Sequence, residues 1–130
     1  MTLRNSYTYD NLLLLKDAGA VTADGAATVA AAARVIDVGL ARFDGIALVD
    51  TSALDLVDTN ETYRVAVQGS VDSAFTTPVE LGSGTVGATG RREIHFGNEQ
   101  GGALYRYVRA FLDVGGTTPS INATIRIGKK

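Results

Sequence analysis

The chain of 130 residues contains no cysteine and a single histidine, His95. Without cysteine there is no disulfide, no thiolate nucleophile and no zinc site built on cysteine. Histidine is the usual proton shuttle near neutral pH, so a catalytic relay or a β-sandwich hydrolase would depend on His95 alone. No serine lies in the G-x-S-x-G context of a nucleophile elbow. We therefore expect a protein that is not an enzyme and that uses no cofactor.

Tryptophan is also absent, and positive charge is not in excess. The formal net charge is −2, whereas nucleic acids and anionic membranes attract proteins through a concentrated positive field. The apolar run at 12–15 is far shorter than the roughly 20 residues of a membrane-spanning helix, and the first ten residues do not resemble a secretory signal. We expect no nucleic-acid or membrane partner, and a soluble protein synthesised in a cytoplasm. The missing tryptophan disfavours a carbohydrate-binding β-sandwich module of a phage tail or secreted protein, which stays the alternative function.

Glycine is abundant, with 15 residues against 2 prolines, and β-branched residues are frequent. This composition favours short strands joined by tight turns. Strands are predicted at 8–15, 35–39, 46–50, 62–69, 79–81, 91–96, 104–114 and 121–127. The pattern predicts an all-β fold, an antiparallel β-sandwich of about eight strands that is either a jelly roll or immunoglobulin-like. Residues 1–130 are expected to form a single domain, with residues 1–9 as a candidate flexible N-terminal arm.

Two local predictions concern pairing and turns. Residues 121–127 alternate strictly between apolar and polar and follow the strand at 104–114 after a short link, so the two are predicted to pair as an antiparallel hairpin. The run Ala30 to Ala33 favours helix, but its β-branched neighbours and the nearby Gly39 leave room for one or two turns at most. We expect a loop or short helix there, before a strand that begins near Arg34.

Two further segments have the appearance of ligand sites. The stretch "DTSALDLVDTNE" carries four acidic residues, but their spacing does not match a calcium loop, so we expect solvated turns and no metal. The acidic residues are Asp50, Asp55, Asp58 and Glu61. The glycine-rich "GSGTVGATG" at 82–90 lacks the lysine and the helix of a phosphate-binding loop. It is predicted to be the tip between two strands.

The segment 103–115 predicts a strand with apolar side chains on both faces, although an antiparallel sheet usually needs only one. One face, which we expect to fill the sandwich, carries Leu104, Arg106, Val108, Ala110, Leu112 and Val114. The other carries Tyr105, Tyr107, Arg109, Phe111 and Asp113. Rigid aromatics beside arginine are the mixture that protein interfaces favour. This second face is covered either by the chain's own loops or by a neighbouring protein.

The candidate interface residues are therefore Tyr105, Tyr107, Arg109 and Phe111, with Arg106 and His95 as additional candidates. His95 alternates with Ile94 and Phe96 in "REIHFG". It is predicted to point away from them, at the surface or at an interface.

Four runs of the sequence, in this order, resemble the small capsid cement, or decoration, proteins of tailed bacteriophages. They are "YDNLLLLKDAGAVTADGAAT", "RVIDVG", "ETYRVAVQGSVDSAFTTPVEL" and "YRYVRAFLDVGGTTPSINATIRIG", and together they span most of residues 8–128. The alanine run at 30–33 and the glycine-rich 97–102 depart from the family pattern, where more polar or proline-containing residues are usual.

The resemblance implies a jelly-roll β-sandwich on the outer surface of an HK97-type head, where it bridges major capsid proteins and stabilises the shell. The implied partners are the major capsid protein and further copies of the chain, as a dimer or trimer. The implied location is the outer surface of the virion, and no catalysis, cofactor or small-molecule substrate is implied. Residues 68–75 would be a strand leading into a turn, to whose backbone Asp72 and Ser73 can hydrogen-bond.

Overall fold

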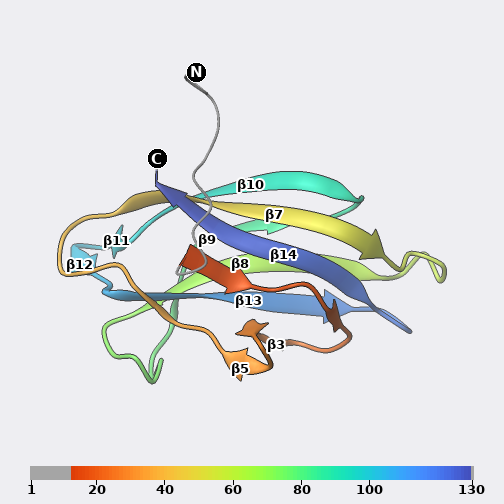
Figure 1. Cartoon of the computed structure of the whole chain (residues 1–130), viewed down its shortest axis with the longest axis horizontal. Helices are drawn as coiled ribbons and strands as arrows, with labels where there is room; N and C mark the ends of the chain where they lie inside the picture. The colour runs from red at the N-terminus through yellow and green to blue at the C-terminus, as the bar shows by residue number, and fades with distance from the viewer. Residues whose placement is uncertain (1–12, 130) are drawn as a thin grey trace, which may run out of the picture.

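A computed structural model describes residues 13–129, which form strands, turns and loops with no α-helix among them (Figure 1). The strands are β1 (Leu14–Lys16), β2 (Ala20–Val21), β3 (Gly25–Ala26), β4 (Thr28–Val29), β5 (Ala32–Ala33), β6 (Ile36–Asp37), β7 (Asp44–Leu54), β8 (Thr62–Ser70), β9 (Val79–Thr85), β10 (Gly90–Gly97), β11 (Glu99–Gln100), β12 (Ala103–Leu104), β13 (Tyr107–Gly115) and β14 (Ile121–Lys129). Of the strand predicted at 8–15, only residues 13–15 are described, and the last two belong to β1; the predicted arm at 1–9 lies outside the described residues. Within 13–129, no helix has the length and apolarity that crossing a membrane requires.

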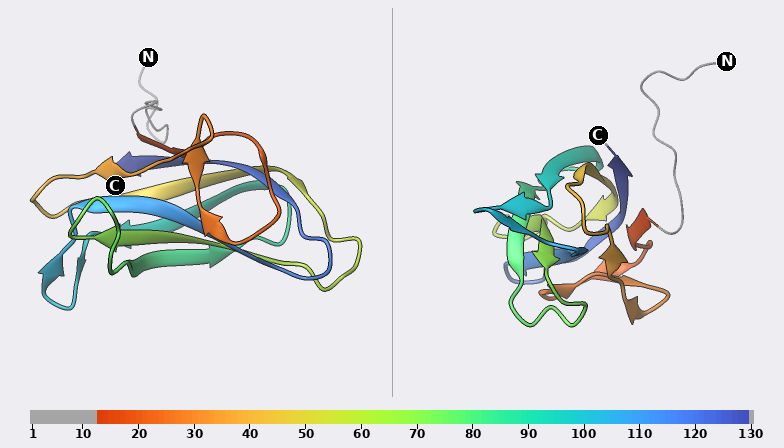
Figure 2. Two further views of the ribbon diagram at one scale, coloured as in Figure 1. Left: turned by 90° about the horizontal axis from the view of Figure 1, so that it is seen from below. Right: turned by 90° about the vertical axis from the view of Figure 1, so that its left-hand side faces the viewer.

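Two antiparallel sheets pack face to face, as the stacked layers of Figure 2 show. Sheet A has the strand order β1-β14-β7-β10, and β2 also pairs with β14. Sheet B has the order β3-β13-β8-β9, and β6 also pairs with β13. Two small hairpins, β4-β5 and β11-β12, extend from the sandwich. The chain is thus an all-β, antiparallel sandwich, as the sequence predicts.

The core lies between the sheets and follows the period-two alternation of the strands. In β13, Val108, Ala110 and Leu112 are buried and face the interior. Facing them in β14 are Ile121, Ala123, Ile125 and Ile127. Each valine, leucine or isoleucine side chain among them contributes about 1.5–3 kcal/mol when fully buried. The predicted inward face is confirmed for β14 and for Val108, Ala110 and Leu112 of β13, whereas Leu104 and Arg106, predicted on the same face, lie outside β13.

The predicted hairpin between residues 104–114 and 121–127 is wrong. β13 pairs with β8 along its whole length in sheet B, and β14 pairs with β7 in sheet A, so the link between them crosses from one sheet to the other. Ser120 anchors this crossing, since its N–H donates to the hydroxyl of Tyr63 over 2.9 Å. Doubling the length of a connecting loop costs only about 0.6 kcal/mol in closure entropy. The long hydrogen-bonded ladders with β8 and β7 therefore outweigh the small gain from pairing two strands that are adjacent in sequence.

The alanine run forms a hairpin, so the loop alternative is right and the short helix is wrong. Ala30 and Ala31 join β4 to β5 with φ values of 52° and 62°, both in the left-handed region, as in a type I′ turn. The carboxylate of Asp17 accepts a hydrogen bond of 2.8 Å from the Ala30 N–H. A helix this short is marginal in water, whereas the hairpin gains this anchor.

The predicted long strand at 104–114 is interrupted. Residues 103–104 belong to the hairpin β11-β12, whose turn contains Gly101 and Gly102 with φ values of 60° and 80°, and β13 begins only at Tyr107. The glycine-rich 97–102 segment is therefore part of a hairpin, because glycine adopts positive φ without steric cost.

Strands β9 and β10 close one side of the sandwich although they belong to different sheets. A Cβ placed on Gly82 would lie 2.6 Å from the carbonyl oxygen of His95 in β10. Only glycine permits this approach. The segment 82–90, predicted as a tip between strands, supplies the end of β9, the connection and the first residue of β10.

Candidate protein-interaction surface

The outer face of sheet B carries three of the predicted interface residues on its central strand. Because Val108, Ala110 and Leu112 of β13 point into the core, the alternate residues Tyr107, Arg109 and Phe111 point outward. All three are half-buried. We call this group the aromatic–arginine face.

The chain itself covers part of this face. The loop between β8 and β9, drawn in green in Figure 1, brings Phe75 onto β13, where the Arg109 guanidinium carbon lies 4.4 Å from the centre of the Phe75 ring. Arg109 Nε also donates a hydrogen bond of 2.8 Å to the Gln68 side chain, and burial lowers the pKa of the guanidinium. Phe75 is only 6% exposed, so this loop, residues 71–78, acts as a strap over the sheet.

Hydrogen bonds to Asp72 hold the strap in place. Its carboxylate accepts bonds from the hydroxyls of Thr76 and Ser70, at 2.7 and 2.8 Å, and from the Thr76 N–H. These donors hold the pKa of Asp72 below its usual value. Phe75 has a φ of 54°, a left-handed conformation that a bulky residue seldom adopts without such support. The predicted role of Asp72 in this turn is confirmed.

Beside the aromatic–arginine face lies an ion pair between β6 and the residue preceding β13. Arg106 donates from Nε and Nη2 to both carboxylate oxygens of Asp37, at 2.8 to 3.1 Å. The pair lowers the pKa of Asp37 and raises that of Arg106. The Arg106 guanidinium carbon also lies 5.3 Å from the ring centre of Tyr107. Although predicted on the inner face, Arg106 is thus turned to the surface, because it precedes the strand.

Two predicted residues are placed differently. Tyr105 lies between β12 and β13, and its N–H donates to the Asn98 carbonyl over 2.7 Å. His95 is exposed on β10, opposite the buried Ile94 and Phe96 as predicted, but β10 belongs to sheet A. The structure therefore brings together Tyr107, Arg109 and Phe111 with Arg106 beside them, and leaves His95 on the other sheet. The sequence-based prediction missed Phe75, whose only signal is an aromatic residue inside a polar loop.

The acidic stretch is built into turns and ion pairs. Asp50 pairs with Arg91, the Asp58 carboxylate accepts from the Thr118 hydroxyl, and Glu61 accepts from the Asp58 N–H. Among residues 13–129, no group of three or more His, Asp or Glu side chains is arranged to hold a metal ion.

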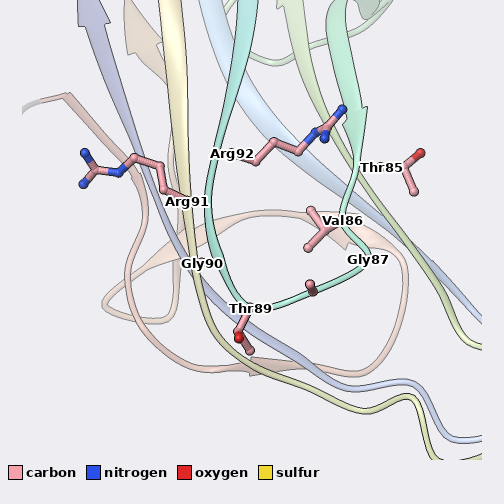
Figure 3. A pocket seen from close by; sticks show the side chains of 8 residues that line it. Thr85, Val86, Gly87, Thr89, Gly90, Arg91 and Arg92 are labelled. Carbon is pink, nitrogen blue, oxygen red and sulfur yellow. The ribbon is translucent and has the colours of Figure 1, made fainter.

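The connection between β9 and β10 borders a cavity of about 280 Å³ that is open to solvent and is lined by residues 85–92 (Figure 3). A second hollow, of about 360 Å³, lies on the outer side of sheet A next to Asp50 and Arg91. The two share Gly90 and Arg91, so they flank the start of β10.

No protein-family model matches the chain, and no curated protein matches it significantly in sequence.

Proposed function

We propose that the chain is a capsid cement protein of a tailed bacteriophage. In this role it binds the outer surface of an HK97-type head, bridges neighbouring major capsid proteins and stabilises the shell without catalysis. The sequence runs at 8–128 support the family, and the all-β sandwich agrees with the fold that the resemblance implies. The observation that carries the interaction role is the aromatic–arginine face, held on the central strand of a sheet.

We propose a jelly roll as the finer description of the sandwich. The pairing is nested: β1 pairs with β14, β3 with β13, β7 with β10 and β8 with β9. If β3 and β6, which both pair with β13, count as one broken strand, the order corresponds to a single long hairpin rolled into two facing sheets. Such nesting supports a jelly roll over an immunoglobulin-like sandwich.

The aromatic–arginine face suits a binding role because its side chains are already ordered. Tyr107 and Phe111 lie on β13, which pairs with other strands on both sides, and Arg109 contacts Phe75 and donates a hydrogen bond to Gln68. Binding to such a surface loses little side-chain entropy, which costs about 0.5–1.5 kcal/mol for each side chain that must be immobilised. A partner would contact mainly Tyr107, Phe111 and the outside of the strap.

The stabilising contributions of the many bound copies add up. The packaged genome presses a head outward, and a clamp across capsomer boundaries increases the free energy needed to separate them. An interface of ordinary size buries about 1,600 Å² in total, and many copies act together. No single contact has to be strong.

The proposal is tested on purified phage heads. Heads stripped of the protein should lose resistance to heat and osmotic shock, and adding it back should restore this resistance. Arg109→Glu should bind stripped heads more weakly and self-associate less, whereas Arg42→Glu reverses a charge that is 66% exposed in a loop and should bind normally. Stripped heads as resistant as complete ones would exclude the stabilising role. Normal binding by folded Arg109→Glu would place the interface elsewhere.

A further inference from the structure

The cavity within residues 85–92 is positively charged. Two of its eight lining residues are arginines and none is acidic. Val86 is 5% exposed, and its N–H donates to the Tyr63 carbonyl over 2.9 Å, which ties the connection to β8. An anchored loop with cationic groups and no carboxylate favours an anionic ligand.

The two arginines differ in how their charges are balanced. Arg91 is paired with Asp50 through two hydrogen bonds, of 2.8 and 3.2 Å. In Figure 3 the Arg92 side chain extends in the opposite direction, from β10 toward β9. No group in residues 13–129 forms a hydrogen bond or an ion pair with Arg92. The cavity therefore carries one uncompensated positive charge.

The position of Arg92 depends on a glycine in β9. A Cβ on Gly84 would lie 2.6 Å from the Arg92 Nε, so the guanidinium reaches across β9 only because residue 84 has no side chain. The backbone of the connection supplies further donors, because the N–H groups of Gly87, Ala88 and Thr89 form no hydrogen bond within the described chain. Arg92 and these three residues line the same pocket, and guanidinium groups and unpaired backbone N–H groups both bind oxyanions.

The charge and the lining discriminate between oxyanions. A single uncompensated guanidinium neutralises a monoanion, whereas a phosphate group carries about −1.5 to −2 charges near neutral pH. A guanidinium also matches the two oxygens of a carboxylate with parallel hydrogen bonds. Val86 and Ala88 add apolar lining, and about 280 Å³ leaves space for an aliphatic stem. These features select a carboxylate on an apolar stem.

We infer that Arg92 and the connection 85–92 form a binding site for an acidic side chain of a partner protein. The partner's identity, the major capsid protein, rests on the proposed function, but the carboxylate specificity does not. The site lies at the end of the sandwich where β9 joins β10, and it is separate in sequence from the aromatic–arginine face on β13.

The site is tested on the free protein by titrating the isotope-labelled chain with propionate at constant ionic strength, and in parallel with inorganic phosphate. Saturable shifts of the Gly87, Ala88 and Thr89 amide signals are expected with propionate. Arg92→Gln should weaken this binding at least about tenfold, since hydrogen bonds to charged groups commonly contribute that factor. Arg42→Gln, which removes an exposed charge outside the site, is the control and should leave the binding unchanged, and Arg92→Lys, which keeps the charge, should bind with intermediate affinity.

Three results would overturn the inference: no saturable shift, equal binding by folded Arg92→Gln, or tighter binding of phosphate than of propionate. Binding to stripped heads, measured for the wild type and for Arg92→Gln, distinguishes a failure of this site from a failure of the proposed function. Propionate binding without any head binding by the wild-type chain would retain the carboxylate site and reject the cement role. Wild-type head binding without propionate binding would retain the cement role and reject the carboxylate site.

Discussion

The Arg109 guanidinium and the Phe75 ring are stacked at 4.4 Å, although the two residues belong to a strand and a loop that are far apart in sequence. This contact answers in part what the second apolar face of the 103–115 segment is for. Its middle is covered by the chain's own strap, and Tyr107 and Phe111 on either side stay half-buried. A partner bound to this face would meet a surface completed by the loop.

Phe75→Ala should lower the free energy of unfolding by about 2–4 kcal/mol. Burial of the ring contributes roughly 1.5–3 kcal/mol, and the cation–π contact adds about 0.5–1 kcal/mol. Phe75→Leu keeps most of the apolar volume and should lose less. Urea unfolding measures both variants, and a Phe75→Leu variant as stable as the wild type would show that the ring's stacking on Arg109 contributes nothing.

Stability of the strap should depend on pH through Asp72. Its native pKa is lowered, so the stability that its carboxylate contributes is fully present above the ordinary value of 3.8 and is lost as the pH falls through the lower native value. Carboxyl titration followed by NMR should give an Asp72 pKa below 3.8 that returns toward this value in Thr76→Val. The Phe75 ring signals should shift over the same pH range. An Asp72 pKa at the ordinary value would contradict the hydrogen-bond network.

Lys16→Met should destabilise the protein by roughly 1–3 kcal/mol, the usual cost of leaving buried hydrogen-bonding groups without partners. Lys16 is 3% exposed, and its ammonium donates to the carbonyls of Asp17, Gly19 and Ala123 at 2.7 to 2.9 Å. Burial lowers its pKa, so these three bonds must offset the desolvation of the charge. Lys16→Gln retains an amide donor and should lose less in thermal unfolding. If Lys16→Met and Lys16→Gln lost equal stability, the loss would come from altered packing and not from the missing hydrogen bonds.

Gly82→Ala should cost about 1–3 kcal/mol, because the new Cβ would lie 2.6 Å from the backbone oxygen of His95 and the two strands would have to separate. Gly87→Ala is the matched control, since a Cβ at that position meets no atom within 4 Å. It should change stability by less than about 0.5 kcal/mol. Chemical denaturation compares the two variants. If Gly82→Ala left the free energy of unfolding unchanged, β9 and β10 would be less closely packed than the 2.6 Å distance implies.

Ala31→Gly should stabilise the β4-β5 hairpin by about 0.5–1 kcal/mol. An alanine at a φ of 62° is strained by roughly 1–2 kcal/mol, part of which the greater chain entropy of glycine offsets. Ala33→Gly, at a strand position, should destabilise instead. A fall in melting temperature for Ala31→Gly would exclude strain in this turn.

Sequence patterning located the long strands well, because the alternation of side chains between two faces is a local property of extended chain. It placed Val108, Ala110 and Leu112 in the core and His95 outside. At the alanine run it left a loop and a short helix open, and the structure has a turn because helix propensity is a weak preference that an anchored turn overrides. It predicted that Tyr107, Arg109 and Phe111 share one face of a strand, as they do in β13, but it missed Phe75, which reaches this face from a loop.

The sequence by itself determined the all-β class and the inward and outward faces of β13 and β14, since both follow from composition and a period of two residues. Only the tertiary structure decided which strands pair and what covers Arg109. Because the entropy of loop closure depends only weakly on loop length, β13 can pair with β8 and not with β14, its neighbour in sequence. A strap from another part of the chain covers part of its outer face. The second face of this strand is therefore partly internal, and its remaining exposed part is the surface proposed for a partner.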